Sequence, residues 1–286
     1  MTQMIENSMR VISTNREMAQ ACRDAEKPVG LVPTMGALHA GHLSLVDQAR
    51  ADNLTVAVSI FVNPTQFGDS KDLDRYPRDL EGDLEMLRRH GVDLVYAPTV
   101  DQVYPEGFDT WVDVGPLAGK LEGLHRPGHF RGVATVVSKL FNLMQPNRAY
   151  FGQKDGQQTV VIQKLARDLD MGVGVVVMPT IREADGLAMS SRNVQLSPEQ
   201  RQAAPVVHDA LFQAYMLWSG GERDGNALLS AATEVLQAEP RVDSIDYVSV
   251  ASMTTLDEVE HVDGRAMVSV AVHMGPVRLI DNIVLE

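Results

Sequence analysis

The chain has 286 residues, of which 44% are hydrophobic and 22% charged, a composition typical of globular proteins. Its net charge of −13 argues against broad nucleic-acid binding, which needs cationic surface to neutralise phosphates. No apolar run approaches the roughly 20 residues of a membrane-spanning helix, and the first residues lack a signal-peptide pattern. The charge and the short apolar runs lead us to expect a protein that binds neither nucleic acid nor a membrane. Its single cysteine, Cys22, excludes an internal disulfide, so we also expect a cytoplasmic protein.

The first two thirds of the chain alternate between β-branched apolar runs and helical patterns. This alternation predicts an α/β fold with a doubly wound, Rossmann-like parallel sheet. The expected helices are Thr14–Ala25, His42–Ala51, Asp79–His90, Val133–Met144 and Gly156–Leu169. The expected strands are Val29–Pro33, Leu54–Val62, Val92–Tyr96, Arg148–Gly152 and Gly172–Pro179.

After about residue 185 the pattern changes, and it predicts a smaller α+β domain. The expected elements there are a helix at Ser197–Trp218, a second helix that ends near Glu239, and strands at Ile245–Val250, Arg265–Met274 and Val277–Leu285. We therefore expect two domains, residues 1–184 and residues 185–286.

The stretch MGALHAGH, Met35 to His42, places two histidines between an apolar strand and a helix. Ligands of open α/β sheets bind at this edge, where a helix N-terminus offers free N–H groups and Gly41 allows close backbone approach. Two imidazoles would add hydrogen bonds to phosphate oxygens, which favours a triphosphate ligand. The alternatives are histidines that only cap the helix, and a zinc site, which would need a third protein ligand.

Two further stretches follow strands in the same way. In NPTQ, the amides of Asn63 and Gln66 can bind a hydroxyl and a carboxylate without adding charge. In GQKDGQQ, Lys154 can bind phosphate, Asp155 suits a helix N-terminus or magnesium, and Gln158 lies one turn further on. An ordinary solvated turn is the alternative for each stretch.

The segment GLAMSSRN, residues 186–193, lies where the first domain gives way to the second. Its two hydroxyls and the fork of donors on Arg192 suit a triphosphate, and its position suits a segment that closes over a ligand. The loop GLHRPGHFRG is a secondary candidate for anion binding, with solvated charges as the alternative. Its basic side chains are His125, Arg126, His129 and Arg131.

Five motifs together, PTMGALHAGH, VNPTQF, YPR, FGQKD and AMSSRN, closely resemble the pantoate–β-alanine ligase (pantothenate synthetase) family over nearly the whole chain. The resemblance implies a cytoplasmic homodimer that condenses (R)-pantoate with β-alanine through a pantoyl adenylate, using ATP and Mg²⁺. Weaker kinship extends to the HxGH nucleotidylyltransferases. The alternative function is therefore a nucleotidylyltransferase that acts on a phosphorylated acceptor, and a non-catalytic nucleotide-binding module is a further one.

The resemblance also implies roles for individual residues. His42 would be the proton donor, Gln66 and Gln158 would bind pantoate, Gln66 would also bind β-alanine, and Asp83 is a candidate helper for magnesium. The residues implied in catalysis are His39, His42, Lys154, Ser190, Ser191 and Arg192. The implied ATP contacts are Met35, Gly36, Ala37, Leu38, His39, Ala40, Gly41, His42, Gly152, Gln153, Lys154, Asp155, Ile181, Met189, Ser190, Ser191 and Arg192.

Overall fold

The computed structural model describes residues 9–68 and 70–286, which divide into two compact units. Unit 1 runs to Asp113 and includes Arg131–Phe151 and Ile162–Met178, and unit 2 consists of Val114–Phe130, Gly152–Val161 and Pro179–Glu286. These units are interleaved along the chain, while the predicted domains 1–184 and 185–286 are consecutive, and that division remains a prediction. Within residues 9–68 and 70–286, no helix combines the length and apolarity that a membrane crossing requires.

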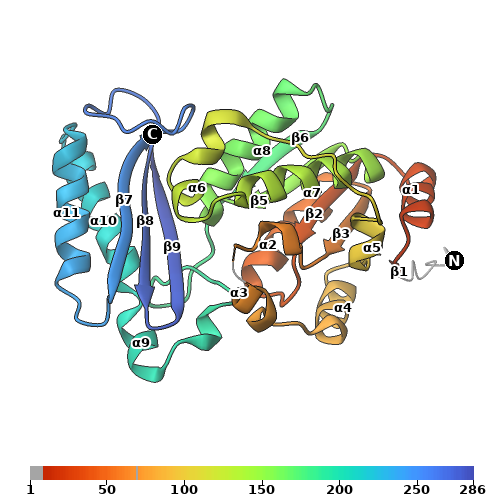
Figure 1. The fold of residues 1–286 in the computed structure, drawn as a ribbon, viewed down its shortest axis with the longest axis horizontal. Helices are drawn as coiled ribbons and strands as arrows, with labels where there is room; N and C mark the ends of the chain where they lie inside the picture. Colours follow the sequence, from red (N-terminus) through yellow and green to blue (C-terminus); the bar gives the residue numbers. More distant parts are fainter. Residues whose placement is uncertain (1–8, 69) are drawn as a thin grey trace, which may run out of the picture. The chain divides into compact units, whose positions relative to one another are not determined.

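Unit 1 is built on a sheet with the strand order β1-β4-β3-β2-β5-β6 among the described residues (Figure 1). The strands are β1 (Arg10–Ile12), β2 (Val29–Thr34), β3 (Thr55–Ile60), β4 (Leu94–Tyr96), β5 (Arg148–Gly152) and β6 (Gly174–Met178). Neighbouring strands run parallel at β1–β4, β4–β3, β3–β2 and β2–β5, which confirms the predicted doubly wound sheet. The direction of winding reverses between β2 and β5, the position at which such sheets bind ligands.

Helices flank this sheet and bury its apolar side chains. Strand β3 has five successive buried residues, as expected for a strand covered on both faces. Val32, Val58 and Leu87 lie in the core that strands and helices share. The helices are α1 (Asn15–Asp24), α2 (Ala40–Asp52), α3 (Ser70–Arg75), α4 (Leu80–Arg89), α5 (Val100–Val103), α7 (His129–Met144) and α8 (Gly156–Asp168), and a 3₁₀ turn, η1, spans Pro64–Gln66.

Unit 2 is built on an antiparallel sheet of three strands in the order β7 (Ser244–Ser252), β8 (Ala266–Met274) and β9 (Val277–Leu285) (Figure 1). Its helices are α6 (Glu122–His125), α9 (Pro198–Ala203), α10 (Val206–Ser219) and α11 (Gly225–Gln237), with 3₁₀ turns η2 (Gly115–Gly119), η3 (Gln153–Asp155) and η4 (Asn193–Gln195). Helices α10 and α11 contact the sheet, and alternate residues such as Val268, Val270 and Val272 lie in their shared core.

Two expectations about elements were wrong. The helix expected at Ser197–Trp218 is two helices, α9 and α10, because Pro205 has no N–H to continue the first one. No helix or strand was expected between Tyr96 and Val133, but the short helices α5 and α6 lie there.

Candidate functional site

The histidine pair of unit 1 lies at the start of α2, as the sequence predicts. His39 is the N-cap residue, and its Nδ1 accepts a hydrogen bond of 3.2 Å from the N–H of Gly41. His42 lies one turn into the helix, and its ring centroid is 4.1 Å from that of His39. Both side chains are half-buried. His39 therefore does cap the helix, and the two imidazoles also stand together at its positively polarised end.

The turn before the histidines has an unusual backbone. Gly36 and Ala37 have φ angles of 81° and 51°, and this left-handed region is costly for alanine. Asp83 of α4 supports the turn, because its Oδ2 and Oδ1 accept the N–H groups of Ala37 at 2.9 Å and Leu38 at 2.7 Å. Burial raises the pKa of this carboxyl, which is 1% exposed, although the two backbone hydrogen bonds act against the shift. Asp83 therefore holds protein backbone here.

Gln66 lies beside the same turn, in the 3₁₀ segment η1. Its Nε2 donates to the Sδ of Met35 at 3.2 Å, and its Oε1 accepts from Asn63 Nδ2 at 2.9 Å. Asn63 is 1% exposed and also accepts from the hydroxyl of Tyr104 at 2.8 Å. The Nδ2 of Asn63 donates to the carbonyl of Gly132 as well, at 3.3 Å. The structure thus brings Gln66 to the histidine motif through buried amides.

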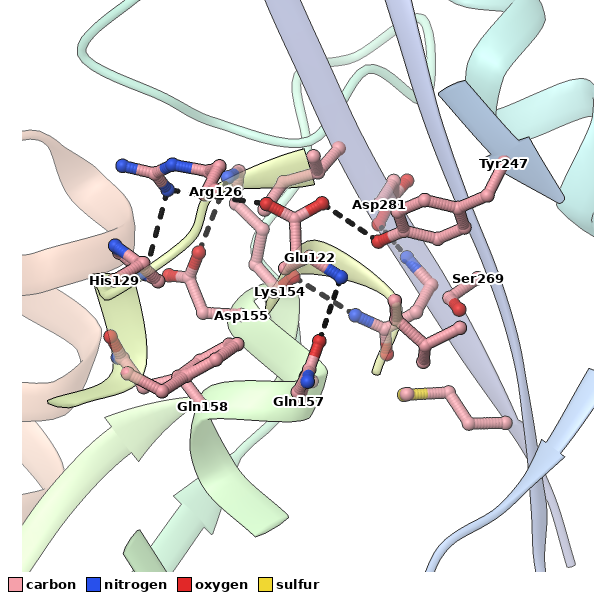
Figure 2. A pocket seen from close by; sticks show the side chains of 16 residues that line it. Glu122, Arg126, His129, Lys154, Asp155, Gln157, Gln158, Tyr247, Ser269 and Asp281 are labelled. Carbon is pink, nitrogen blue, oxygen red and sulfur yellow. Dashed lines mark hydrogen bonds and ion pairs between the residues drawn. The ribbon is translucent and has the colours of Figure 1, made fainter. Parts of the chain in front are cut away.

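Unit 2 contains a small cavity of about 40 Å³ (Figure 2). Lys154, Asp155 and Gln158, all predicted as site residues, line it. Arg126 and His129 of the basic loop line it too, and their side chains approach within 3.5 Å of each other. The cavity therefore gathers cationic and amide groups, which can bind an oxygen-rich anion, beside the carboxylates of Glu122, Asp155 and Asp281.

The rest of the basic loop is used differently. Arg131 lies over the ring of Trp111, with 4.5 Å between its Cζ and the ring centroid. His125 faces Asp246, with 3.9 Å between its Nδ1 and a carboxylate oxygen. Of the four basic side chains, Arg126 and His129 line the cavity, and anion binding by this loop stays a prediction.

Glu122, which lines this cavity, belongs to a buried ion pair. The Glu122 carboxylate accepts from both terminal nitrogens of Arg278, at 2.7 and 2.8 Å, and from the hydroxyl of Tyr247 at 2.8 Å. Burial raises the pKa of Glu122, but the hydrogen bonds and charge of Arg278 outweigh it, and the net pKa is lowered. Arg126 lies 4.0 Å from the same carboxylate. Glu122 thus stays charged and links α6 to β9 through Arg278. It also links α6 to β7 through Tyr247 (Figure 2).

The GQKD turn is tied to β9 by Asn282, which the sequence analysis missed. Its Nδ2 donates to the carbonyls of Gln153 and Lys154 at 2.8 and 2.9 Å, and its Oδ1 accepts from Gln153 Nε2 at 2.8 Å. A Cβ at Gly156 would lie 2.9 Å from Asn282 Nδ2, so a larger residue there would disturb this contact. Gln157 is 4% exposed, and its Oε1 accepts a hydrogen bond of 2.9 Å from the backbone N–H of Glu122.

The MSSR segment lies elsewhere in unit 2. The N–H of Met189 donates to the carbonyl of Ile181 at 3.0 Å, so these two predicted ATP contacts are adjacent. The backbone N–H of Arg192 donates to the hydroxyl of Ser190 at 3.3 Å. Among the described residues that line the 40 Å³ cavity, none comes from Ile181 or Met189–Arg192.

No cluster of three or more His, Cys, Asp or Glu side chains suited to a metal occurs among residues 9–68 and 70–286.

Comparisons with known proteins match nearly the whole chain. A model of the pantoate-beta-alanine ligase family matches residues 7–284. The chain is 57% identical to the pantothenate synthetase of Roseiflexus sp. strain RS-1 over 97% of this chain and 100% of that protein. A crystal structure of pantothenate synthetase from Thermus thermophilus has a TM-score of 0.92 and 49% identity, covering 96% of this chain and 99% of that one.

A second similar structure carries ligands. It is pantoate-beta-alanine ligase from Francisella tularensis complexed with beta-gamma ATP and beta-alanine, with a TM-score of 0.78 and 32% identity. The match covers 96% of this chain and 97% of that one. Taken with the family model and the motifs at the histidine turn and the GQKD turn, these likenesses show that the chain belongs to the pantoate–β-alanine ligase family.

Proposed function

We propose that this protein condenses (R)-pantoate with β-alanine at the expense of ATP, and releases pantothenate, AMP and diphosphate. The observation that carries the proposal is the histidine turn, with two imidazoles 4.1 Å apart at a helix N-terminus and Gln66 beside Met35. Family membership, and the ATP and β-alanine named for the Francisella tularensis structure, support it.

The reaction has two steps that need no nucleophile from the protein. A pantoate carboxylate oxygen attacks the α-phosphorus of ATP, and the bond to the β-phosphate breaks to release diphosphate. The amine of β-alanine then attacks the acyl carbon, the bond to AMP breaks, and the amine loses a proton. The protein's contribution is to hold the reactants in line and to offset phosphate charge.

The residue roles follow from the family motifs and from the local geometry. We assign phosphate contacts to His39 and His42. We also assign to His42 the role of proton donor. Lys154 and Arg192 would offset phosphate charge from unit 2. The remaining proposed ATP contacts are Met35, Gly36, Ala37, Leu38, Ala40, Gly41, Gly152, Gln153, Asp155, Ile181, Met189, Ser190 and Ser191.

Gln66 and Gln158 are the proposed contacts of pantoate, and Gln66 that of β-alanine. A glutamine amide both donates and accepts, which matches a substrate that carries hydroxyl groups and a carboxylate. Gln66 is 9% exposed and already bonded on both sides, so its amide is held in one orientation.

Magnesium belongs to the proposed reaction as the partner of the nucleotide. Mg²⁺ keeps several waters and is commonly bound through phosphates and one or two carboxylates, and Asp155 beside Lys154 offers one such carboxylate. When bound, the ion would neutralise phosphate charge. We further propose a cytoplasmic homodimer, in keeping with the family and with the lone buried Cys22.

The test is an AMP-release assay in which pantoate and β-alanine are omitted in turn. We expect sustained AMP release only when ATP, pantoate and β-alanine are all present. Pantothenate should then form in an amount equal to that of AMP. No AMP at all, or AMP that forms equally without β-alanine, would contradict the ligase reaction, and product that retains the nucleotide would indicate the nucleotidylyltransferase alternative.

The variant His42→Ala tests the proposed role of the histidine. We expect adenylate formation to fall by about 10²–10⁴-fold, the usual contribution of a general acid and of charge stabilisation. His261→Ala is the control, because the His261 side chain is 59% exposed and lies outside the proposed site. Full activity in His42→Ala would contradict the assignment.

A further inference from the structure

Asp83 offers its whole carboxylate to the backbone of the histidine turn. It lies in the first turn of α4, and its oxygens accept the N–H groups of two successive residues, Ala37 at 2.9 Å and Leu38 at 2.7 Å. Asp83 is 1% exposed, although free aspartates almost always face water. These two N–H groups lie between β2 and α2, outside the ladder of either element, so the carboxylate satisfies donors that would otherwise be orphaned.

The turn itself is shaped to receive this carboxylate. Ala37 has a φ of 51°, a conformation that persists in a non-glycine residue only when its surroundings impose it. A Cβ at Gly36 would lie 2.9 Å from Asp83 Oδ2 and 3.1 Å from Ile60 Cγ2, so only glycine permits the close approach. Thr34 completes the support, because its hydroxyl accepts the N–H of Gly36 at 3.2 Å and donates to the carbonyl of Ser59 at 2.8 Å.

The supported backbone leads directly into the histidines. Leu38, whose N–H Asp83 accepts, is followed by the N-cap His39, and His42 comes one turn later. A change in the φ and ψ of residues 36–38 would therefore rotate the whole start of α2 and move both imidazoles away from their present separation of 4.1 Å.

From this geometry we infer that Asp83 is a positioning residue, which holds the histidine turn in the conformation that binds the triphosphate of ATP. The inference rests on the proposed function, since it takes the turn to be the ATP-binding element. Asp83 acts through backbone N–H groups and touches no reactant. The role of magnesium helper, which the family resemblance suggests for Asp83, is the competing outcome.

The decisive experiment measures nucleotide affinity with and without metal. The probe is β,γ-methylene-ATP, titrated by calorimetry into the full chain in EDTA and again in Mg²⁺, for wild type, Asp83→Asn and Glu81→Gln. Asn keeps the shape of Asp, but one oxygen becomes an NH₂ group that cannot accept. Glu81→Gln removes the same charge from an exposed position of the same helix.

We expect Asp83→Asn to weaken binding at least tenfold, by the same factor with and without Mg²⁺, and Glu81→Gln to leave affinity unchanged. Weakening confined to the Mg²⁺ titration would overturn the inference in favour of a metal contact. Unchanged affinity in Asp83→Asn would overturn it as well. A wild-type chain that binds the nucleotide but releases no AMP would instead count against the proposed function.

A second arm separates positioning from every direct contact. Glycine adopts the left-handed turn without support, so Asp83→Asn should cost less affinity in an Ala37→Gly background than in the wild-type background. A metal or nucleotide contact of Asp83 would give equal costs in both backgrounds. If Asp83→Asn does not fold, Gly36→Ala disturbs the same contact from the turn's side, and unimpaired nucleotide binding in that variant would refute the inference.

Discussion

Replacing Glu122 with glutamine tests the buried ion pair between Glu122, which lines the cavity of unit 2, and Arg278. The change keeps the shape of the side chain and removes its charge. In the native structure the carboxylate accepts three short hydrogen bonds, two from Arg278 and one from Tyr247. Gln can still accept at one oxygen, but its NH₂ group would face a donor.

The expected cost can be worked out from these contacts. A hydrogen bond to a charged group contributes about 1.5–3 kcal/mol, and breaking a buried pair from one side costs about 3–5 kcal/mol. Arg278 keeps a second anion, because its Nε donates to Asp246 at 2.6 Å and its charge is not orphaned. We therefore expect Glu122→Gln to lower the free energy of unfolding of unit 2 by about 3 kcal/mol, at the lower end of that range.

The assay is urea unfolding followed by the fluorescence of Trp218, which packs against the core of unit 2. The chain has two tryptophans, so Trp111→Phe is introduced into every variant. Glu234→Gln, at an exposed position of α11, is the control and should change stability by less than about 0.5 kcal/mol.

The pH dependence gives an independent check. The pKa of Glu122 in the folded chain is lowered from 4.5 by Arg278, in spite of burial, so its stabilisation is complete above that value and is lost as pH falls through the folded pKa. The difference between wild type and Glu122→Gln should thus be full at pH 7 and shrink below about pH 4.5. A difference under about 0.5 kcal/mol at pH 7, or one that does not change with pH, would refute the reasoning.

Two further outcomes follow from packing and burial. In Gly132→Ala, the new Cβ would lie 2.5 Å from the carbonyl oxygen of Thr65, next to Gln66, so we expect a loss of about 1–3 kcal/mol in a thermal melt and a higher KM for pantoate. Gly264→Ala, which meets nothing within 4 Å, should match wild type, and equal behaviour of the two variants would contradict the packing argument. Burial raises the pKa of the Cys22 thiol to about 11, so little reactive thiolate is present at pH 8. We therefore expect mass spectrometry to detect alkylation of Cys22 by iodoacetamide only after denaturation. Prompt alkylation of the native chain would contradict this expectation.

The central strands could be predicted from sequence because their apolar runs carry the information locally. Strand β2 ends at Thr34 and β3 at Ile60, each within two residues of its predicted end. By contrast, β1 (Arg10–Ile12) was missed, since it has three residues of which two are exposed, and no pattern of burial exists to be read. Pro205 did mark the break between α9 and α10, and its missing N–H should have counted against a single helix.

The candidate site divides in the same way. Motifs such as MGALHAGH stand at strand ends, so their position could be inferred from neighbouring residues alone. Glu122 and Asn282 could not, because their partners lie 156 and 129 residues away along the chain. One local signal existed, since Arg278 and Asn282 are four residues apart on strand β9 and so lie on the same face of the sheet, and Asp281 is the only other polar residue of that strand.

The bond between Glu122 and Arg278 also bears on how the chain is made. A ribosome adds about 5–20 residues per second, so the 156 residues between the two partners take roughly 8–30 s to synthesise. For that time the nascent chain carries the Glu122 carboxylate, and for most of it also the GQKD turn, without the strand that completes their hydrogen bonds. Unit 2 can therefore finish folding only after β9 has been synthesised and has left the ribosome, and a nonsense codon upstream of Val277 would remove the partners of both segments at once.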